Sequence, residues 1–407
     1  MLTKLYIDGF RLWADTTITF RSGVPTVLIG PNGSGKTTIL EVLSFLSVAA
    51  SDGLRSAVYD VRGGPSEFFR AGSNELHIEI WIGSKPGRLS FDQDHRVPLH
   101  YQLSLGRAGA FVQVNKETIS TYPAGFDHDR VLFLDRDRVS SKILNATTEE
   151  WDEIPSGDDE RLVFESIRQD RNYPVLRIVR ESLSRLRVYS GFSTQPRWTL
   201  DPREREMSPR NAVVVQPQYS LDPTGRGLVN ALYTLQQHDE QKWSYLLRQM
   251  KAEFPFCERI VFPPDPGGAK LALAWQDSRF PGLLSAEQMS EGMWSFLLLL
   301  AALLPKDPAE LVAFDEPDTH LHPSALRRLV GLLEEASSES TVVFTSHSSR
   351  VLDELDEPSK SVVICEPTDG GAAIREMDQD RTQAWLKEYD GFGELREHGL
   401  LDPENRR

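Results

Sequence analysis

The stretch TVLIGPNGSGKTTILEVLSFL, residues 26–46, decides the fold. Its first four residues are apolar or β-branched and predict a short strand. Residues 30–37 match the pattern G-x-x-x-x-G-K-[ST], and apolar side chains at 39, 40, 43 and 46 then recur with helical spacing. A strand, this loop and a helix in that order predict a nucleotide-binding P-loop.

Each residue of this loop has an expected role in binding ATP and Mg²⁺. Glycine lets the backbone curl so that its N–H groups point at phosphate oxygens, and the helix N-terminus adds its dipole. We expect Lys36 to reach the β- and γ-phosphates and Thr37 to bring a hydroxyl to Mg²⁺. The other predicted binding residues are Gly30, Pro31, Asn32, Gly33, Ser34, Gly35 and Thr38.

Two further apolar runs end in polar residues. LVAFDEPDTH, residues 311–320, predicts a strand followed by Asp315, a candidate Mg²⁺ ligand, and Glu316, placed to orient or deprotonate water. TVVFTSHSS, residues 341–349, predicts a strand that brings His347 to a γ-phosphate or water. The nearby pair His320 and His322 lacks the fourth ligand that zinc needs, which favours a turn before a helix starting at Pro323.

The greasiest segment is SEGMWSFLLLLAALL, residues 290–304. Its apolar run of nine residues is too short for a membrane span, which needs roughly 20, so we expect a buried core helix. Ser290 and Gly292 stand at its start, where a helix N-terminus offers a second anion site.

Composition limits the class of protein. The chain has 407 residues, 40% of them hydrophobic and 26% charged, which suits two domains or one large domain with an insertion. A net charge of −15 argues against a uniformly basic surface. The N-terminus lacks a signal-peptide pattern, and Cys257 and Cys365 are too few for a disulfide framework or a zinc site. We therefore expect a cytoplasmic protein outside the membrane.

Taken together, the motifs resemble those of ABC-type ATPase heads, and more narrowly the RecF, SMC and OLD-type group. The opening KLYIDGFRLWADTTITF, residues 4–20, the helix with S-x-G, and DEPDTHLHP, residues 315–323, carry this resemblance over roughly residues 1–50 and 220–355. The chain is similar to the stand-alone predicted AAA family ATPases without a nuclease domain.

The resemblance implies a homodimer or higher oligomer in which two heads sandwich ATP. Ser290 and Gly292 would then contact the γ-phosphate of ATP on the other head. Glu316 would be the catalytic carboxylate, His347 the switch histidine, and Arg11 an arginine near the nucleotide.

Three family motifs are altered here. The signature is M-S-E-G-M, residues 289–293, and Asp318 is the nearest acid to the usual D-loop position. The glutamine loop is expected where VLFLDRDR, residues 131–138, ends, but Asp135 and Arg136 stand there instead.

We predict an α/β fold: an ABC-type P-loop NTPase head with a mixed sheet, an antiparallel β-subdomain and an inserted helical lid. The expected parts are an N-terminal ATPase lobe with the β-meander (1–139), the helical lid (140–215) and a C-terminal ATPase lobe (216–407). Alternating strands at 75–115 and helical periodicity at 162–189 support this division. The arginines of the lid are open to two interpretations, a nucleic-acid contact or a solvated face: Arg177, Arg180, Arg185 and Arg187.

The functional prediction is an ATP-hydrolysing switch that controls DNA engagement or a separate, nuclease-like effector, in anti-phage defence or DNA repair. The 60 residues after His347 are too few for a typical further domain of roughly 100 residues, so the effector would be another protein. The alternatives are the ATPase subunit of an ABC transporter and a scaffold that uses ATP structurally.

Overall fold

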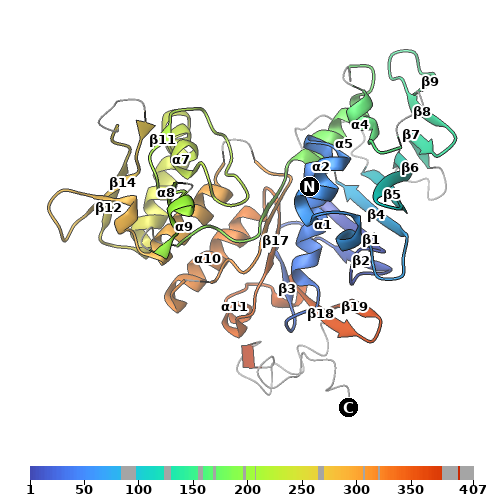
Figure 1. Ribbon diagram of the computed structural model, residues 1–407. Helices are drawn as coiled ribbons and strands as arrows, with labels where there is room; N and C mark the ends of the chain where they lie inside the picture. The colour runs from blue at the N-terminus through green and yellow to red at the C-terminus, as the bar shows by residue number, and fades with distance from the viewer. Residues whose placement is uncertain are drawn as a thin grey trace.

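Two large β-sheets form the frame of the molecule (Figure 1). It is a computed structural model that describes residues 1–83, 98–122, 130–154, 159–167, 171–195, 199–206, 208–264, 270–305, 308–319, 321–377 and 393–394. One sheet has six strands and is mostly parallel, and the other has eight strands and is antiparallel. The predicted α/β class with a mixed sheet and an antiparallel β-subdomain is confirmed.

The six-stranded sheet has the order β10-β16-β17-β3-β18-β19. Its first five strands are parallel, and β19 closes the edge in the antiparallel direction. The strands are β3 (Thr26–Ile29), β10 (Leu186–Tyr189), β16 (Leu311–Phe314), β17 (Thr341–Thr345), β18 (Val362–Thr368) and β19 (Gly371–Glu376).

Both faces of this sheet are covered, which explains why its central strands are apolar throughout. Every residue of β3, β16 and β17 is buried. Successive side chains point to opposite faces, so Ala313 packs in one hydrophobic core while Val312 and Phe314 pack in the other. The sheet therefore separates two cores that share its strands.

The first core joins the P-loop helix to the antiparallel sheet. Its helices are α1 (Lys36–Ser51), α2 (Leu54–Arg62), α3 (Pro65–Phe68), α4 (Val163–Ser166) and α5 (Pro174–Ser184). The antiparallel sheet runs β2-β1-β4-β5-β6-β7-β8-β9. Its strands are β1 (Leu2–Asp8), β2 (Thr16–Thr19), β4 (Glu75–Ile82), β5 (Leu99–Ala108), β6 (Phe111–Thr121), β7 (Val131–Asp137), β8 (Ser141–Leu144) and β9 (Trp151–Glu153).

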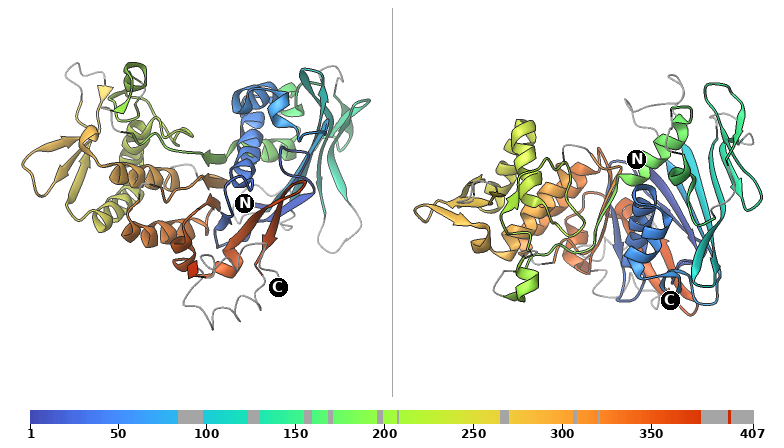
Figure 2. Two further views of the ribbon diagram at one scale, coloured as in Figure 1. Left: turned by 60° about the horizontal axis from the view of Figure 1, so that its bottom comes forward. Right: turned by 45° about the horizontal axis from the view of Figure 1, so that its top comes forward.

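The second core lies on the other face of the six-stranded sheet, and its helices form the separate lobe seen in Figures 1 and 2. Its helices are α7 (Leu228–His238), α8 (Glu240–Glu253), α9 (Glu291–Leu303), α10 (Pro323–Ala336) and α11 (Ser349–Asp353). Short strands extend the lobe: β11 (Val213–Val214), β12 (Cys257–Val261), β13 (Lys270–Leu271), β14 (Ala274–Asp277) and β15 (Leu283–Ser285). The helices α6 (Pro202–Glu206) and α12 (Pro358–Ser361) lie in connections.

The apolar run at 296–304 belongs to α9 and is buried from Phe296 to Ala302, as expected of a core helix. In the described part of the chain, no helix combines the length and the apolarity that crossing a membrane requires.

The segment 140–215 is less helical than predicted. Strands β8 and β9 extend the antiparallel sheet, and β10 pairs in parallel with β16. The helical periodicity at 175–189 in fact covers both α5 and β10, because Leu186, Val188 and Tyr189 are buried strand residues rather than a further helical turn. The expectation of an inserted helical lid is corrected to this extent, and the boundaries at 139 and 215 stay a prediction.

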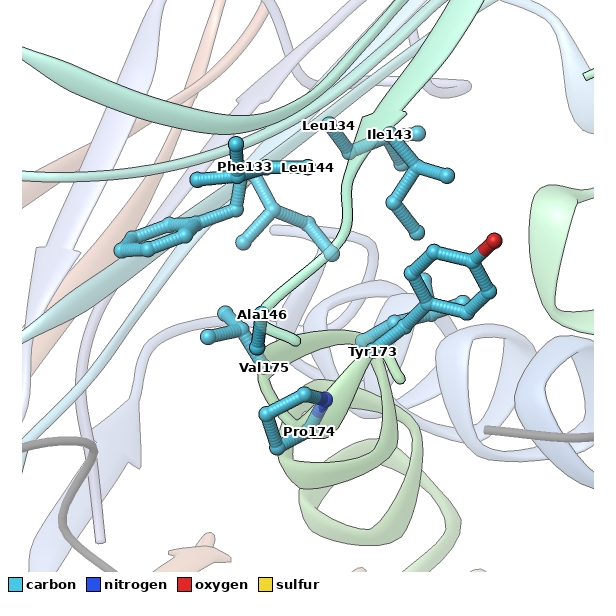
Figure 3. A pocket seen from close by; sticks show the side chains of 10 residues that line it. Phe133, Leu134, Ile143, Leu144, Ala146, Tyr173, Pro174 and Val175 are labelled. Carbon is cyan, nitrogen blue, oxygen red and sulfur yellow. The ribbon is translucent and has the colours of Figure 1, made fainter. Parts of the chain in front are cut away.

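Packing also ties this segment to the body of the protein. Figure 3 shows Leu134 and Ile143 of the antiparallel sheet above Tyr173, Pro174 and Val175 at the start of α5. The space between them is about 10 Å³, barely room for one water molecule, so it is a packing gap and not a ligand pocket.

The four arginines of this segment are half-buried. The Arg180 guanidinium donates to the carbonyl of Ala50 at the end of α1, 3.3 Å away. This arrangement does not decide between the two interpretations of the cluster. His320 lies outside the described residues.

Candidate nucleotide-binding site

The P-loop links β3 to α1, and its backbone needs glycine. Gly30, Gly33 and Gly35 have φ angles of 150°, 79° and 88°, in the region that L-residues avoid. A β-carbon on Gly30 would lie 2.1 Å from the carbonyl oxygen of Cys365 on β18, and one on Gly35 would lie 2.8 Å from the ring of Trp13. The backbone of Cys365 and the ring of Trp13 therefore leave room only for glycine at positions 30 and 35 of the loop.

The concave side of this turn carries donors suited to phosphate. The Lys36 ammonium donates to the carbonyls of Gly30 and Pro31 at 2.9 and 3.0 Å, so it lies inside the loop. Gly35, the N-cap of α1, has no side chain to satisfy the N–H groups of the first turn. The Ser34 hydroxyl is buried and has no hydrogen-bond partner among the described residues. The Ser34 hydroxyl and the N–H groups at the start of α1 fit an anion at the helix N-terminus.

Trp13 connects the N-terminal β-hairpin to this loop. Its ring is fully buried, and its indole N–H donates to the carbonyl of Gly35 at 3.2 Å. Sequence reasoning missed this residue, because nothing local to Trp13 indicates a contact 22 positions away.

The predicted metal ligands meet across β17, because β16, which precedes Asp315, and β3, which precedes the P-loop, lie on either side of that strand. The Thr37 hydroxyl lies 3.3 and 3.2 Å from the two carboxylate oxygens of Asp315. Thr345, at the end of β17, donates to Asp315 Oδ1 at 2.6 Å. A hydroxyl and a carboxylate at the mouth of a phosphate loop are oxygen ligands of the kind that Mg²⁺ uses together with water and phosphates. The donor set therefore fits the predicted ion.

The candidate catalytic pair also meets. His347 Nε2 lies 3.1 Å from Glu316 Oε1, and both side chains reach solvent. Glu316 has φ 48°, a left-handed conformation that is uncommon for a residue with a β-carbon. Strained residues of this kind cluster at functional sites.

The remaining predicted residues of the loop divide into a rim and a floor. Pro31, Asn32 and Gly33 are exposed, whereas Thr38 is buried below them. Arg11 also has a positive φ, 48°, and its guanidinium lies 3.1 Å from Glu41 Oε2 on α1. Its link to the loop therefore runs through the P-loop helix.

Ser290 and Gly292 lie at the start of α9, which packs in the second core, whereas the P-loop helix α1 packs in the first. Ser290 is the N-cap of α9, and its hydroxyl accepts the N–H of Met293 at 3.2 Å. Because α9 packs on the opposite face of the sheet from α1, the two predicted anion sites belong to different lobes (Figure 1).

Arg210 holds the start of α9 in place, and sequence reasoning missed it. Its side chain is buried and donates to the carbonyls of Ala286 and Met289, each at 2.8 Å, and of Thr194 at 2.8 Å. The guanidinium also lies 4.8 Å from the ring centre of Trp294. Burial lowers the pKa of Arg210.

The sequence leaves the glutamine of the glutamine loop open, with Asp135 and Arg136 at the expected place. Strand β7, which ends at Asp135 and Arg136, lies in the antiparallel sheet, where Arg136 pairs with the buried Glu117. The strand beside β16 is β10, and the loop after it contains Gln195. In the sequence, β7 and β10 are both short apolar runs, and only the strand pairing shows that β10, and not β7, belongs to the parallel sheet.

The loop after β10 and the loop after β16, which carries Asp315 and Glu316, line one hollow of about 310 Å³. Its lining includes Phe192 and Thr194 on one side and Asp315, Glu316 and Ser295 on the other. Gln195 directly follows this lining and is exposed.

Asp318 turns inward. The Ser346 hydroxyl donates to its Oδ2 at 3.0 Å, while Oδ1 is buried with no partner among the described residues. Burial raises the pKa of Asp318.

The two cysteines are buried thiols of low reactivity, because burial raises the thiol pKa of Cys257 to about 11 and of Cys365 to about 12.

Solved structures that share this architecture include SMC head domains. The SMC head bound to the C-terminal winged-helix domain of ScpA aligns over 94% of this chain and 99% of its own, with TM-score 0.53 and 15% identity. An SMC head with an extended coiled coil, bound to a C-terminal domain of ScpA from Pyrococcus furiosus, aligns over 95% and 98%, with TM-score 0.50 and 15% identity. The fold is that of an SMC head domain. At this identity the likeness concerns the fold alone.

Two family models match separate parts of the chain. A family model described as "AAA domain" matches residues 4–94, and one described as "AAA domain, putative AbiEii toxin, Type IV TA system" matches residues 248–353. The DNA double-strand break repair Rad50 ATPase of Methanopyrus kandleri is 46% identical over 44 residues, which are 11% of this chain and 5% of that relative.

Proposed function

We propose that the protein binds and hydrolyses ATP with Mg²⁺ and uses the nucleotide to join two copies of itself. The observation that carries the proposal is the meeting of Thr37, Asp315, Glu316 and His347 at one edge of the parallel sheet. Ligands of open α/β sheets bind at the carboxyl ends of the strands, where these four side chains lie.

The residues have complementary roles in this proposal. The N–H groups of the loop and the Lys36 ammonium bind the phosphates, and Thr37 with Asp315 would hold Mg²⁺. When bound, Mg²⁺ supplies charge neutralisation at the β- and γ-oxygens. Glu316 orients the attacking water and accepts its proton, while His347 fixes the carboxylate and contacts the γ-phosphate. Gln195 is the proposed glutamine of the loop after β10.

The placement of Ser290 supports action between two copies. The N-terminus of α9, which Ser290 caps, belongs to the lobe of the second core. In this proposal it does not contact ATP on the P-loop of its own chain but binds a phosphate of ATP held by a second copy. ATP would then be enclosed between two heads, and hydrolysis would release them.

The cellular role proposed is a switch for DNA engagement or for a separate, nuclease-like effector, in DNA repair or anti-phage defence. The matched segment of a DNA repair ATPase and the toxin–antitoxin family model support this direction. An ATPase subunit of a transporter is the less favoured alternative, because the signature at 289–293 and the residues at the expected glutamine loop depart from the transporter pattern.

Mass by light scattering, with and without ATP and Mg²⁺, tests the proposal. Glu316→Gln should lower turnover by about 10²–10⁴-fold while it keeps ATP binding, and so accumulate a dimer. Ser290→Arg, added to Glu316→Gln, should abolish the gain in mass, while Ser290→Ala is the control for simple loss of the cap. A wild-type protein that neither turns over ATP nor changes mass would refute the proposal. Retained ATP with negligible turnover would favour a scaffold.

A further inference from the structure

The end of β17 contacts three different acids through three consecutive side chains. Thr345 donates to Asp315 at 2.6 Å, Ser346 donates to Asp318 at 3.0 Å, and His347 lies 3.1 Å from Glu316. The acids follow β16, the neighbouring parallel strand, whose last paired residue, Phe314, lies beside Phe344 of β17.

Thr345 occupies a distinct position among the three. It is fully buried, and its hydroxyl makes two hydrogen bonds at once. It donates to Asp315 Oδ1 and accepts the backbone N–H of Glu316 at 2.9 Å. A hydroxyl can donate one bond while it accepts another, which valine of the same shape cannot do.

The bond to Glu316 lies where the backbone needs support. A left-handed φ is unfavourable for a residue with a β-carbon, so the surroundings of Glu316 must hold it in that conformation. The N–H of Glu316 is held by Thr345, and its carbonyl accepts the N–H of Thr319 at 3.1 Å. The Thr345 hydroxyl therefore contacts both the carboxylate of Asp315, the proposed metal ligand, and the backbone of Glu316, which carries the proposed catalytic carboxylate.

We infer that Thr345 is a positioning residue, whose hydroxyl fixes Asp315 toward Thr37 and holds Glu316 in its left-handed conformation. The inference rests on the proposed ATPase function, because it assigns these contacts to the same reaction. A purely structural threonine would stabilise β17 without affecting either acid.

Thr345→Val and Thr345→Ser separate the two roles, and Thr341→Val is the matched control. Thr341 is buried on the same strand, but its hydroxyl donates to the carbonyl of Leu2 at 2.8 Å and touches neither acid. If Thr345→Val does not fold, Thr345→Cys replaces it, because a thiol of similar size is only a weak donor.

The first readout needs no ATP hydrolysis. Amide hydrogen exchange at Glu316 should speed up by at least about tenfold in Thr345→Val, because the N–H loses its acceptor. Thr345→Ser and Thr341→Val should keep the wild-type rate. Unchanged exchange in Thr345→Val would overturn the inference even if the wild type proves to be an active ATPase.

The second readout is steady-state hydrolysis across a Mg²⁺ titration. Thr345→Val should lower kcat by about 10–100-fold and raise the Mg²⁺ concentration for half-maximal rate, with KM for ATP within about threefold of wild type. Thr345→Ser should restore most of the rate. A wild type without turnover would instead refute the proposed function, and the exchange result would still decide the role of Thr345.

Discussion

At the scale of single residues, two glycines of the P-loop tolerate a β-carbon very differently. Gly33 has open space around it, whereas a β-carbon on Gly30 meets the Cys365 carbonyl at 2.1 Å. Gly33→Ala should lower the free energy of unfolding by about 1 kcal/mol, the cost of the left-handed φ alone. Gly30→Ala should cost at least about 3 kcal/mol, because backbone must also move. Calorimetric melting of both variants measures the difference, and equal costs would contradict this account of the loop.

Asp318 should make the protein more stable as the pH falls. Because burial raises its folded-state pKa, its contribution to stability is fully present below the unfolded pKa of about 3.9 and is lost as the pH rises through the folded pKa. Asp318→Asn should therefore raise the melting temperature at pH 8, and this gain should disappear below about pH 4.

Asp137 is a control of opposite sign. Two backbone N–H groups, from Ser140 and Val139, lower its pKa, so it stabilises the fold above the unfolded pKa and loses this effect as the pH falls through the folded pKa. Asp137→Asn should lower the melting temperature at pH 8. If both variants shift stability in the same direction, the assignment for Asp318 is wrong.

At the scale of elements, the position of α9 depends on one buried arginine. Arg210→Met keeps much of the volume but leaves three carbonyls, of Ala286, Met289 and Thr194, without their donor. We expect a loss of about 2–4 kcal/mol in the free energy of unfolding. Arg327→Met, at an exposed ion pair on α10, should cost much less than Arg210→Met. Similar losses in the two variants, measured by chemical denaturation, would show that Arg210 does not anchor the helix.

The elements of the site were predictable from sequence where the signal is local. The residues 26–46 carry strand, loop and helix in one stretch, and each polar strand end at 315 and 347 directly follows its apolar run. Thr345 and Gln195 were not predictable as site residues. Their positions depend on which strands are neighbours, and the contact of Thr345 with Asp315 spans 30 positions of sequence.

At the scale of the whole molecule, the same limit explains the error in the segment 140–215. Strand pairing across the antiparallel sheet and packing of α5 on α1 are long-range, so periodicity alone favoured a helical lid. The sequence specifies the layer on each side of the six-stranded sheet better than it specifies the segment 140–215, because a sheet buried on both faces requires apolar strands and a layer on each side.

The net charge of −15 sets how salt should act on two joined copies. Two chains of like charge repel, and about 0.1 M salt screens this repulsion beyond roughly 10 Å. The ATP-bound dimer of Glu316→Gln should therefore tighten by several-fold between about 50 and about 300 mM NaCl, as measured by light scattering across a dilution series. A complex held by phosphate contacts of nucleic acid would instead weaken steeply over that range. Weakening of the protein dimer by salt, without any nucleic acid present, would show that ion pairs and not buried contacts hold the two heads together.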